Sequence, residues 1–200
     1  MSDEATHDGE PDPLDLTSQA EGGFWESLKQ ESSPYLLDPK FRRHYRQYIF
    51  QALLATGAMV IILLFVDSLA TAAIAAGLGS SVVGIFINPS GTTARLRAVI
   101  GGHTMALLIG TAFSFVLFTG GMESFITDNT QYLDLAMAFS VGLLILVMAV
   151  TDTEHPPAAG IVIGMTSREW TPEVFGAILG ALALLGVIKI VLRRQLRDLL

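Results

Sequence analysis

Residues 48–66 read YIFQALLATGAMVIILLFV, and this stretch sets the class of fold. Its 19 residues include no charged side chain. A helix rises about 1.5 Å per residue, and the hydrocarbon core of a bilayer is about 30 Å thick. The stretch is therefore long enough to span that core, and we expect a transmembrane helix here.

Five further apolar runs follow along the chain. Three of them are strong: 98–119, 135–150 and 174–188. Two are weaker, since 69–87 is interrupted by Gly and Ser, and 156–165 is too short to cross a bilayer unaided. We therefore predict an all-α polytopic membrane protein with about six membrane segments, four strong and two short or broken. If the weak segments enter and leave on one side, four crossings remain.

The overall composition agrees with a membrane protein. Hydrophobic residues make up 51% of the chain, charged residues only 16%, and the mean hydropathy is +0.52. A soluble domain usually has about 25% charged residues, so an ordinary soluble enzyme is excluded. The chain has no Cys, which excludes disulfides and thiolate metal sites. Without a basic stripe that contains aromatic residues, nucleic acid is not expected as a partner.

The net charge of −7 belongs to the N-terminal region. Residues 1–39 hold ten acidic residues and one basic residue, so the rest of the chain is weakly positive. The first 39 residues are also rich in Ser, Pro and Gly and have no apolar periodicity, which is typical of disorder. We predict two regions, a disordered acidic tail at 1–39 and a transmembrane domain at 40–200.

Basic residues flank the two outer membrane segments. They are Lys40, Arg42, Arg43 and Arg46 before the first, and Lys189, Arg193, Arg194 and Arg197 at and after the last. The loop 120–131 contains neither Lys nor Arg. By the positive-inside rule both termini should be cytoplasmic, and a bacterial or archaeal plasma membrane is the expected location. Lys189 is expected to extend along the last helix toward the interface.

Two weak segments resemble each other. Residues 80–87, SSVVGIFI, align with residues 156–163, PPAAGIVI, so that Gly84 matches Gly160. Each half of the domain then consists of a strong, a broken and a strong helix. Three crossings in each half would invert one half relative to the other, which is the inverted-repeat plan of many secondary transporters. We therefore predict a 3+3 inverted repeat.

The expected starts of the two broken helices suggest an anion site. Ser80 or Ser81 would cap the first, and Pro156 and Pro157 suit the first turn of the second. A helix start has unpaired N–H groups and a partial positive charge, so two starts that meet would attract a small anion. The alternative is that both segments are kinks filled by neighbouring side chains.

The same segments carry a family resemblance. Residues 151–158, TDTEHPPA, resemble the His-Pro-Pro motif that gives the HPP family of integral membrane proteins its name. The upstream elements GSSVV at 79–83, Asn88-Pro89-Ser90, and RAVIGGH at 97–103 are similar to further blocks of that family. The resemblance covers about residues 45–195. Some plastid and cyanobacterial members are linked to nitrite transport, so the resemblance implies a nitrite-like monovalent anion as substrate.

Several ionisable residues are candidates for this role. His155 precedes a helix start, where it either contacts the anion or packs on the prolines, and His103 lies inside a strong segment, where ionisable groups usually face a cavity. Arg97 either attracts anions or anchors the helix end. Glu154 and Asp152 are either solvated or take part in proton coupling. The spacing contains no metal-binding motif, and we expect neither metal nor cofactor.

Three classes of function stay open on the sequence alone. The first is a transporter or channel for a small monovalent anion, with Ser80, Ser81, Asn88, Arg97, His103, Glu154, His155, Pro156 and Pro157 as binding residues. The second is a membrane sensor or partner subunit that acts through its acidic tail. The third is a membrane-embedded enzyme that uses His155 and Glu154 as acid and base, which we do not favour because no nucleophile accompanies them. We expect a homo-oligomer, because one copy has few helices to enclose a path.

Overall fold

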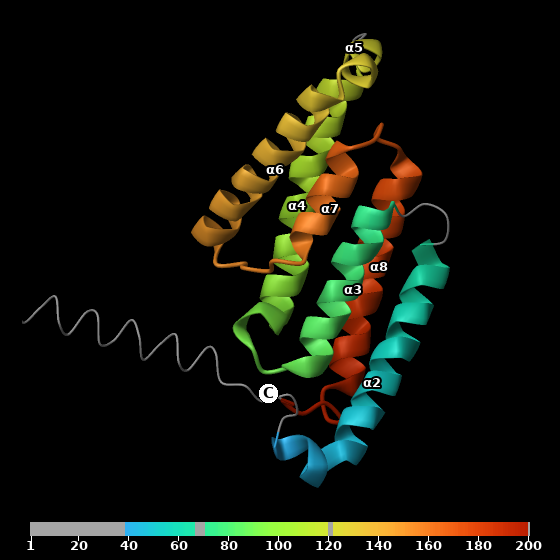
Figure 1. Ribbon diagram of the computed structural model, residues 1–200, viewed down its shortest axis with the longest axis vertical. Helices are drawn as coiled ribbons and strands as arrows, with labels where there is room; N and C mark the ends of the chain where they lie inside the picture. The colour runs from blue at the N-terminus through green and yellow to red at the C-terminus, as the bar shows by residue number, and fades with distance from the viewer. Residues whose placement is uncertain (1–38, 67–70, 120–121, 200) are drawn as a thin grey trace, which may run out of the picture. The chain divides into compact units, whose positions relative to one another are not determined.

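The computed structural model describes residues 39–66, 71–119 and 122–199, and every regular element in these ranges is a helix (Figure 1). The all-helical class predicted above is confirmed. In chain order the elements are α2 (Pro39–Val66), α3 (Ala72–Ile87), the 3-10 turn η2 (Thr92–Ala94), α4 (Leu96–Phe118), α5 (Glu123–Asp128), α6 (Thr130–Thr151), α7 (Ala158–Thr166) and α8 (Pro172–Leu192).

The chain divides into two units, residues 1–44 and 45–200. Of the first unit the structure describes 39–44, the beginning of α2, so almost all of the predicted acidic tail lies outside the described residues. His44 has φ −124° and ψ 19°, which interrupts the helical backbone of α2. The sites discussed below all lie in the second unit.

Four of the described helices are long and apolar enough to cross a membrane: Arg43–Val66 of α2, α4, α6 and α8. They contain the four strong apolar runs except for Thr119, which lies just past the end of α4, so these four predicted spans are confirmed as long apolar helices. Each helix extends beyond its run. In α6, for example, the helix begins at Thr130 and includes the exposed Asp134, because a helix can continue past the apolar core into polar surroundings.

The start of the second unit lies beside the end of the described chain. Gln47 Nε2 donates a hydrogen bond to the Gln195 carbonyl at 3.0 Å, and Tyr48 Oη donates to the Leu199 carbonyl at 2.6 Å. One turn further along α2, buried Gln51 donates to a third carbonyl, that of Phe86 at the end of α3. The part of α2 around Gln47 and the residues after α8 are thus at the same end of the bundle.

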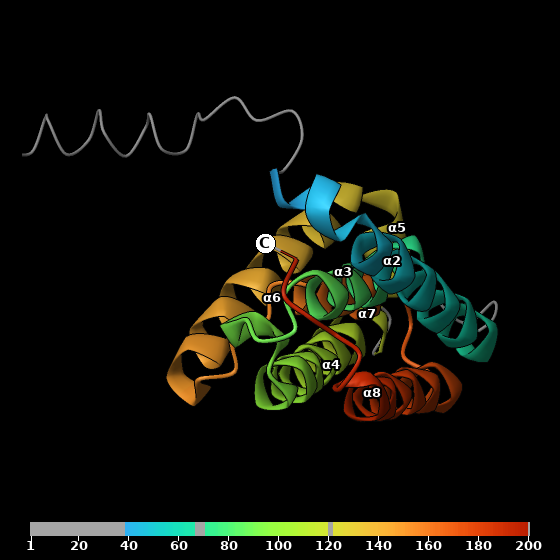
Figure 2. The same cartoon turned by 90° about the horizontal axis from the view of Figure 1, so that it is seen from below.

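The two weak segments form α3 and α7, which lie among the long helices rather than at the edge (Figures 1 and 2). α7 packs against α3, α4 and α6. α3 and α7 cross at two glycines. A Cβ added to Gly77 would lie 2.9 Å from the Pro157 carbonyl oxygen, and one added to Gly160 would lie 2.7 Å from Gly77 Cα. The sequence alignment matched Gly160 with Gly84, but Gly77 is the residue that it meets.

The expected N-cap at Ser80 or Ser81 is wrong. α3 begins at Ala72, and Thr71 caps it by accepting a hydrogen bond from the Ile74 N–H at 3.4 Å. Ser80 and Ser81 lie inside the helix, where both hydroxyls donate back to the Gly77 carbonyl. Such back-bonding to a carbonyl three or four residues earlier satisfies a serine within a helix, so no break is needed.

The expectation that two helix starts meet is also wrong. Gly164, near the end of α7, lies against Thr71 at the start of α3, with Thr71 Oγ1 2.8 Å from an added Cβ. The start of α7, at Pro157, lies beside Gly77 in the middle of α3. α3 and α7 therefore run in opposite directions, and their starts lie apart along the pair.

The segment from 152 to 168 follows α4 over most of its length. It meets α4 successively at Gly101, where Thr153 packs, at Gly110, where Met165 packs, and at Ser114, whose hydroxyl donates to the Arg168 carbonyl at 2.6 Å. Only nine residues of this segment are helical, as the short apolar run predicts. Glycines on α4 leave room for the segment because they lack side chains.

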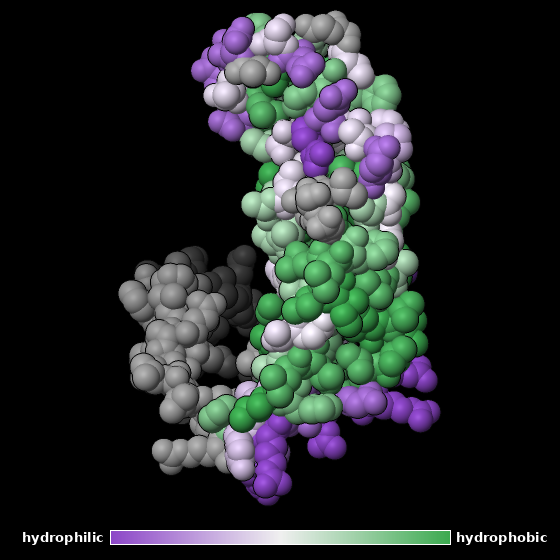
Figure 3. Space-filling view, turned by 90° about the vertical axis from the view of Figure 1, so that its right-hand side faces the viewer, coloured by the Kyte–Doolittle hydropathy of each residue, from purple (hydrophilic) through white to green (hydrophobic). Residues whose placement is uncertain are grey.

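Two further regions complete the described fold. The loop predicted at 120–131 contains a short helix, α5. The long helices expose many apolar side chains, and on the face shown in Figure 3 hydrophobic residues gather in a broad patch. Such an extended exposed apolar surface suits contact with lipid.

Candidate functional site

Three polar side chains from separate segments meet in the interior of the bundle. Ser81 comes from α3, His103 from α4, and His155 from the linker between α6 and α7. All three are buried, with exposed fractions of 0%, 0% and 2%. We call these three residues the polar cluster. Each of them was a candidate from the sequence, but only the fold brings them together.

The Ser81 hydroxyl is the centre of the cluster. Its Oγ lies 3.2 Å from His103 Nε2 and 2.9 Å from His155 Nε2. The ring centroids of the two histidines are 4.7 Å apart, with an angle of 43° between the ring planes. The same Oγ lies 2.8 Å from the Gly77 carbonyl. The two Nε2 atoms and the Gly77 carbonyl thus compete for the single hydrogen of the Ser81 hydroxyl.

The other ring nitrogen of each histidine faces a backbone carbonyl. His103 Nδ1 lies 2.8 Å from the Val99 oxygen, and His155 Nδ1 lies 2.7 Å from the Thr93 oxygen. A carbonyl oxygen can only accept a hydrogen bond, so each Nδ1 must bear the proton. In a neutral ring the Nε2 then has a lone pair, and both lone pairs point at Ser81 Oγ.

Two consecutive glycines of α4 give His155 access to the cluster. A Cβ added to Gly102 would lie 2.8 Å from His155 Cβ and 2.9 Å from the Thr153 carbonyl oxygen, and one added to Gly101 would lie 2.5 Å from Thr153 Cγ2. The linker therefore lies directly against the α4 backbone. This close approach explains the Gly-Gly-His sequence at 101–103. The two glycines leave room for the linker, and His103 then lies beside His155.

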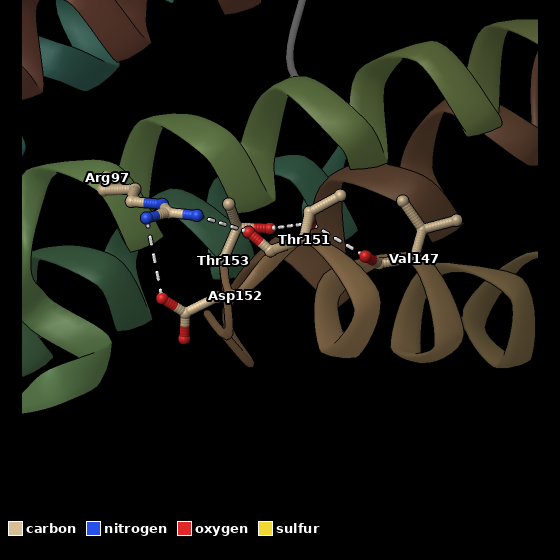
Figure 4. A network of polar contacts seen from close by, with 5 residues as sticks. All are labelled: Arg97, Val147, Thr151, Asp152 and Thr153. Atoms are coloured by element: carbon tan, nitrogen blue, oxygen red, sulfur yellow. Dashed lines mark hydrogen bonds and ion pairs between the residues drawn. The ribbon is translucent and has the colours of Figure 1, made fainter.

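A polar network holds the linker on its outer side (Figure 4). The Arg97 guanidinium donates to the Thr151 carbonyl at 2.9 Å and lies 3.7 Å from the Asp152 carboxylate. The hydroxyls of Thr151 and Thr153 share a hydrogen bond of 2.7 Å. Asp152 adopts a left-handed conformation, φ 53°, which reverses the chain after α6. Arg97 and Asp152 are both exposed, so their ion pair alone contributes little stability.

A polar pocket of about 260 Å³ opens next to this network. It is lined by Thr92, Arg95, Arg97, Ala98, Asp152 and Glu154. Glu154 is exposed here and does not reach the polar cluster, although it precedes His155 in the chain. The pocket combines two guanidinium groups with two carboxylates, and the carboxylates belong to the linker that carries His155.

The other predicted site residues lie outside the cluster. Ser80 is exposed on α3, and Asn88 is exposed at the end of that helix, where its backbone N–H donates to the Gly84 carbonyl. Pro156 is exposed and Pro157 is half-buried at the α7 start. They shape the backbone rather than place polar atoms at the buried centre.

The start of α7 offers few free N–H groups. The first three available donors, the N–H groups of Ala158, Ala159 and Gly160, bond to the carbonyls of residues 155, 156 and 157 at 2.9 to 3.1 Å. An anion site made of unpaired N–H groups at this helix start is therefore not present. Any anion at the centre has to use side-chain donors.

Lys189 has a role that the sequence did not suggest. Its ammonium donates to the carbonyls of Pro89 and Ala94 in the α3–α4 connection. α8 continues past Lys189 to Leu192, and the expected extension of this side chain toward the interface stays a prediction. The neighbouring Thr93 carbonyl binds His155. Lys189 and His155 thus bind carbonyls of the same connection between α3 and α4. The sequence gives no sign of this, because every residue has a backbone carbonyl.

The surroundings of His155 favour its neutral form. Burial lowers the pKa of His155, the bond to the Thr93 carbonyl raises it, and the positive charge of Lys189 lowers it further. No third His, Cys, Asp or Glu joins the two imidazoles to form a metal-binding group in the part of the chain that the structure describes. The cluster is therefore suited to hydrogen bonding and proton exchange.

A comparison with known families matches most of the chain. The family model described as "HPP, transmembrane region" matches residues 40–197. The chain belongs to the HPP family. This match and the four long apolar helices identify it as an integral membrane protein. No curated protein and no solved structure matches this HPP protein.

Proposed function

We propose that this HPP protein transports a small monovalent anion, with nitrite as the leading candidate, across the membrane by way of the polar cluster. The observation that carries the proposal is the chemistry of the buried polar residues. Among the described residues the buried polar set is Gln51, Ser81, His103, Ser114, Ser140, Thr153, His155 and Thr166, and it includes no carboxylate. A buried centre without negative charge favours an anion over a cation.

The cluster can offer donors to such an anion. Ser81 has one O–H group, and each imidazole that becomes protonated gains a second N–H donor at Nε2. Nitrite is a small bent anion with oxygen atoms that accept hydrogen bonds. Charge-assisted hydrogen bonds from an imidazolium would offset part of its lost hydration.

Arg95 and Arg97 support the route to this centre. Both line the polar pocket outside the linker that holds His155. Guanidinium groups at the mouth of a low-dielectric path raise the local concentration of anions. The negative charges of Asp152 and Glu154 weaken the attraction that the two arginines exert on an anion. The pocket is therefore suited to weak binding and rapid passage of the anion rather than to tight binding.

We extend the proposal to arrangement and assembly. Long, short and long helices recur as α2–α4 and α6–α8, and the antiparallel α3 and α7 support an inverted repeat around their crossing. A homo-oligomer follows from the small number of helices in one copy. A cytoplasmic location of both termini follows from the basic residues beside α2 and α8.

Uptake into proteoliposomes tests the transport proposal. We expect purified protein to carry nitrite faster than protein-free vesicles do. Ser81→Ala should reduce the rate at least about tenfold, because one lost hydrogen bond to a charged group is worth about 1.5–3 kcal/mol. His103→Gln and His155→Gln should reduce the uptake rate by a similar factor.

Ser80→Ala is the matched control. Its hydroxyl also donates to the Gly77 carbonyl, but Ser80 is exposed and does not contact either histidine. Its transport rate should stay near that of the natural sequence. Equal rates for protein and empty vesicles at every pH would overturn the nitrite proposal, and equal losses in both serine variants would remove the polar cluster from it.

A further inference from the structure

We propose that Ser81, His103 and His155 bind one shared proton, held as a single imidazolium, and that this proton accompanies the anion during transport. The claim that the proton accompanies the anion rests on the function proposed above. The claim that the three residues bind one shared proton rests on the geometry of the cluster alone and can be tested without transport.

Hydrogen-bond donors and acceptors in the cluster do not balance while both rings are neutral. Each Nδ1–H then donates to a carbonyl, and each Nε2 has only a lone pair. Ser81 has one hydrogen to donate, but its oxygen lies within 3.2 Å of both Nε2 atoms. At least one of these two contacts therefore places a nitrogen lone pair against an oxygen lone pair, and both do while the Ser81 hydroxyl donates to the Gly77 carbonyl. Buried polar contacts of this kind are costly when they lack a hydrogen.

One additional proton resolves the conflict. If His155 binds it, His155 Nε2–H donates to Ser81 Oγ, and the Ser81 O–H turns from the Gly77 carbonyl to donate to His103 Nε2. The Gly77 carbonyl keeps the Ser80 hydroxyl as a donor. Every atom of the triad then has a suitable partner. A second proton would place two positive charges on rings whose centroids are 4.7 Å apart, so we expect only one.

The proton can move within the cluster. When Ser81 accepts the proton of His155 Nε2 and passes its own hydrogen to His103 Nε2, the charge transfers from the linker to α4. The bonds that break are His155 Nε2–H and the old Ser81 O–H, and those that form are a new Ser81 O–H and His103 Nε2–H. The number of protons stays the same, so Ser81 acts as a relay.

Within the described ranges of the chain, neighbouring charges do not supply a buried counter-ion. α3 and α7 have no titratable side chain, and η2 is followed by the exposed Arg95. Arg97 of α4 is paired with Asp152 at the outer surface, and Glu154 is exposed. Lys189 of α8 is bound to carbonyls. A proton at the cluster is therefore a net positive charge that an anion can neutralise.

Nitrogen NMR of labelled histidine in lipid nanodiscs tests the proton count. The chain has four histidines, and His7→Gln with His44→Gln leaves the two buried rings as the sole signals. At high pH both rings should be neutral with the proton on Nδ1. As the pH falls below the ordinary imidazole value of about 6.5, one imidazolium equivalent per chain should appear. Addition of nitrite should shift this uptake to higher pH.

Two serine variants complete the test. Ser81→Ala should move proton uptake to lower pH by about one unit or more, because the bridging acceptor is lost. Ser80→Ala should leave it unchanged. The proposal is overturned if both rings stay neutral while the fold persists, if both become charged, or if Ser81→Ala has no effect.

Flux measurements separate this proposal from the proposed function. One proton with each anion predicts nitrite uptake that an inward proton gradient drives and a membrane potential does not. Uptake that follows the potential and ignores the proton gradient would overturn the coupling while transport stands. A shared proton seen by NMR without any nitrite flux would remove the transport function while the proton site stands.

Discussion

Gly102 shows how a single missing side chain sets the geometry of the polar cluster. Its backbone lies so close to the linker that an added Cβ would be 2.8 Å from His155 Cβ and 2.9 Å from a backbone oxygen. Neither atom belongs to a flexible side-chain end that could move aside at little cost. The residue next to it, His103, therefore meets His155 only because position 102 is glycine.

We expect Gly102→Ala to destabilise the protein by about 1–3 kcal/mol, the usual range for overpacking of a well-packed interior. Gly142→Ala is the control, because nothing lies within 4 Å of its added Cβ, and alanine is favoured over glycine inside a helix by about 1 kcal/mol. Thermal unfolding of both variants in detergent measures the difference. A midpoint for Gly102→Ala at or above that of the natural sequence would contradict this account of the linker packing.

At the scale of elements, the crossing of α3 and α7 determines what the site contains. Both helices are too short or too rich in small residues to be strong spans, yet they occupy the middle of the bundle (Figure 2). Gly77 and Gly160 let their backbones approach, and small residues are the usual means of close helix packing in membranes. One turn after Gly77, the same helix places Ser81 between the two histidines.

Two glycines of α3 allow a matched test of this crossing. Gly77→Ala would place a Cβ 2.9 Å from the Pro157 carbonyl, while Gly84→Ala on the same helix meets nothing within 4 Å. We expect Gly77→Ala to lower the unfolding temperature and to reduce nitrite uptake, because α7 and the linker that precedes it would shift. Gly84→Ala should leave uptake unchanged and should not lower the unfolding temperature, because alanine is favoured over glycine inside a helix. Similar behaviour of the two variants would show that the close crossing does not matter for folding or transport.

At the scale of the whole molecule, one end of the second unit is rich in arginine. Ser90 N–H donates to Asp198 Oδ1, so the α3–α4 connection lies with the residues after α8. Arg95, Arg97, Arg193, Arg194 and Arg197 belong to this end or its flanks. α5 lies beyond the far end of α4, a helix of 23 residues and about 35 Å.

Cysteine labelling in cells tests the orientation, and the chain has no native Cys to remove. We expect Ser90→Cys to react with a membrane-permeant maleimide and to be protected from an impermeant one added outside. Asp128→Cys, in α5, should react with both reagents. The opposite pattern would reverse the proposed topology, and equal external reactivity would mean that α4 does not cross the bilayer.

The candidate site was predictable in part from particular residues. His103 was singled out because ionisable groups inside an apolar segment usually face a cavity, and His155 because it precedes a helix start. Both are buried in the cluster. Ser81 was proposed for a different reason, as a helix cap, and that reason was wrong. Lys189 and Gly102 were not predicted, because both contact backbone atoms of other segments. No pattern in the sequence around either residue indicates such a contact.

By itself the sequence determined that the chain is a helical membrane protein with four strong spans. The length and hydropathy of a segment are local properties, and they decide whether it can cross a bilayer. The tertiary structure alone decided that Ser81, His103 and His155 meet, and that the α3 and α7 starts do not. Those outcomes depend on where backbones approach within a few ångströms, at Gly77, Gly102 and Gly160, and such approaches are a property of packed segments rather than of any one of them.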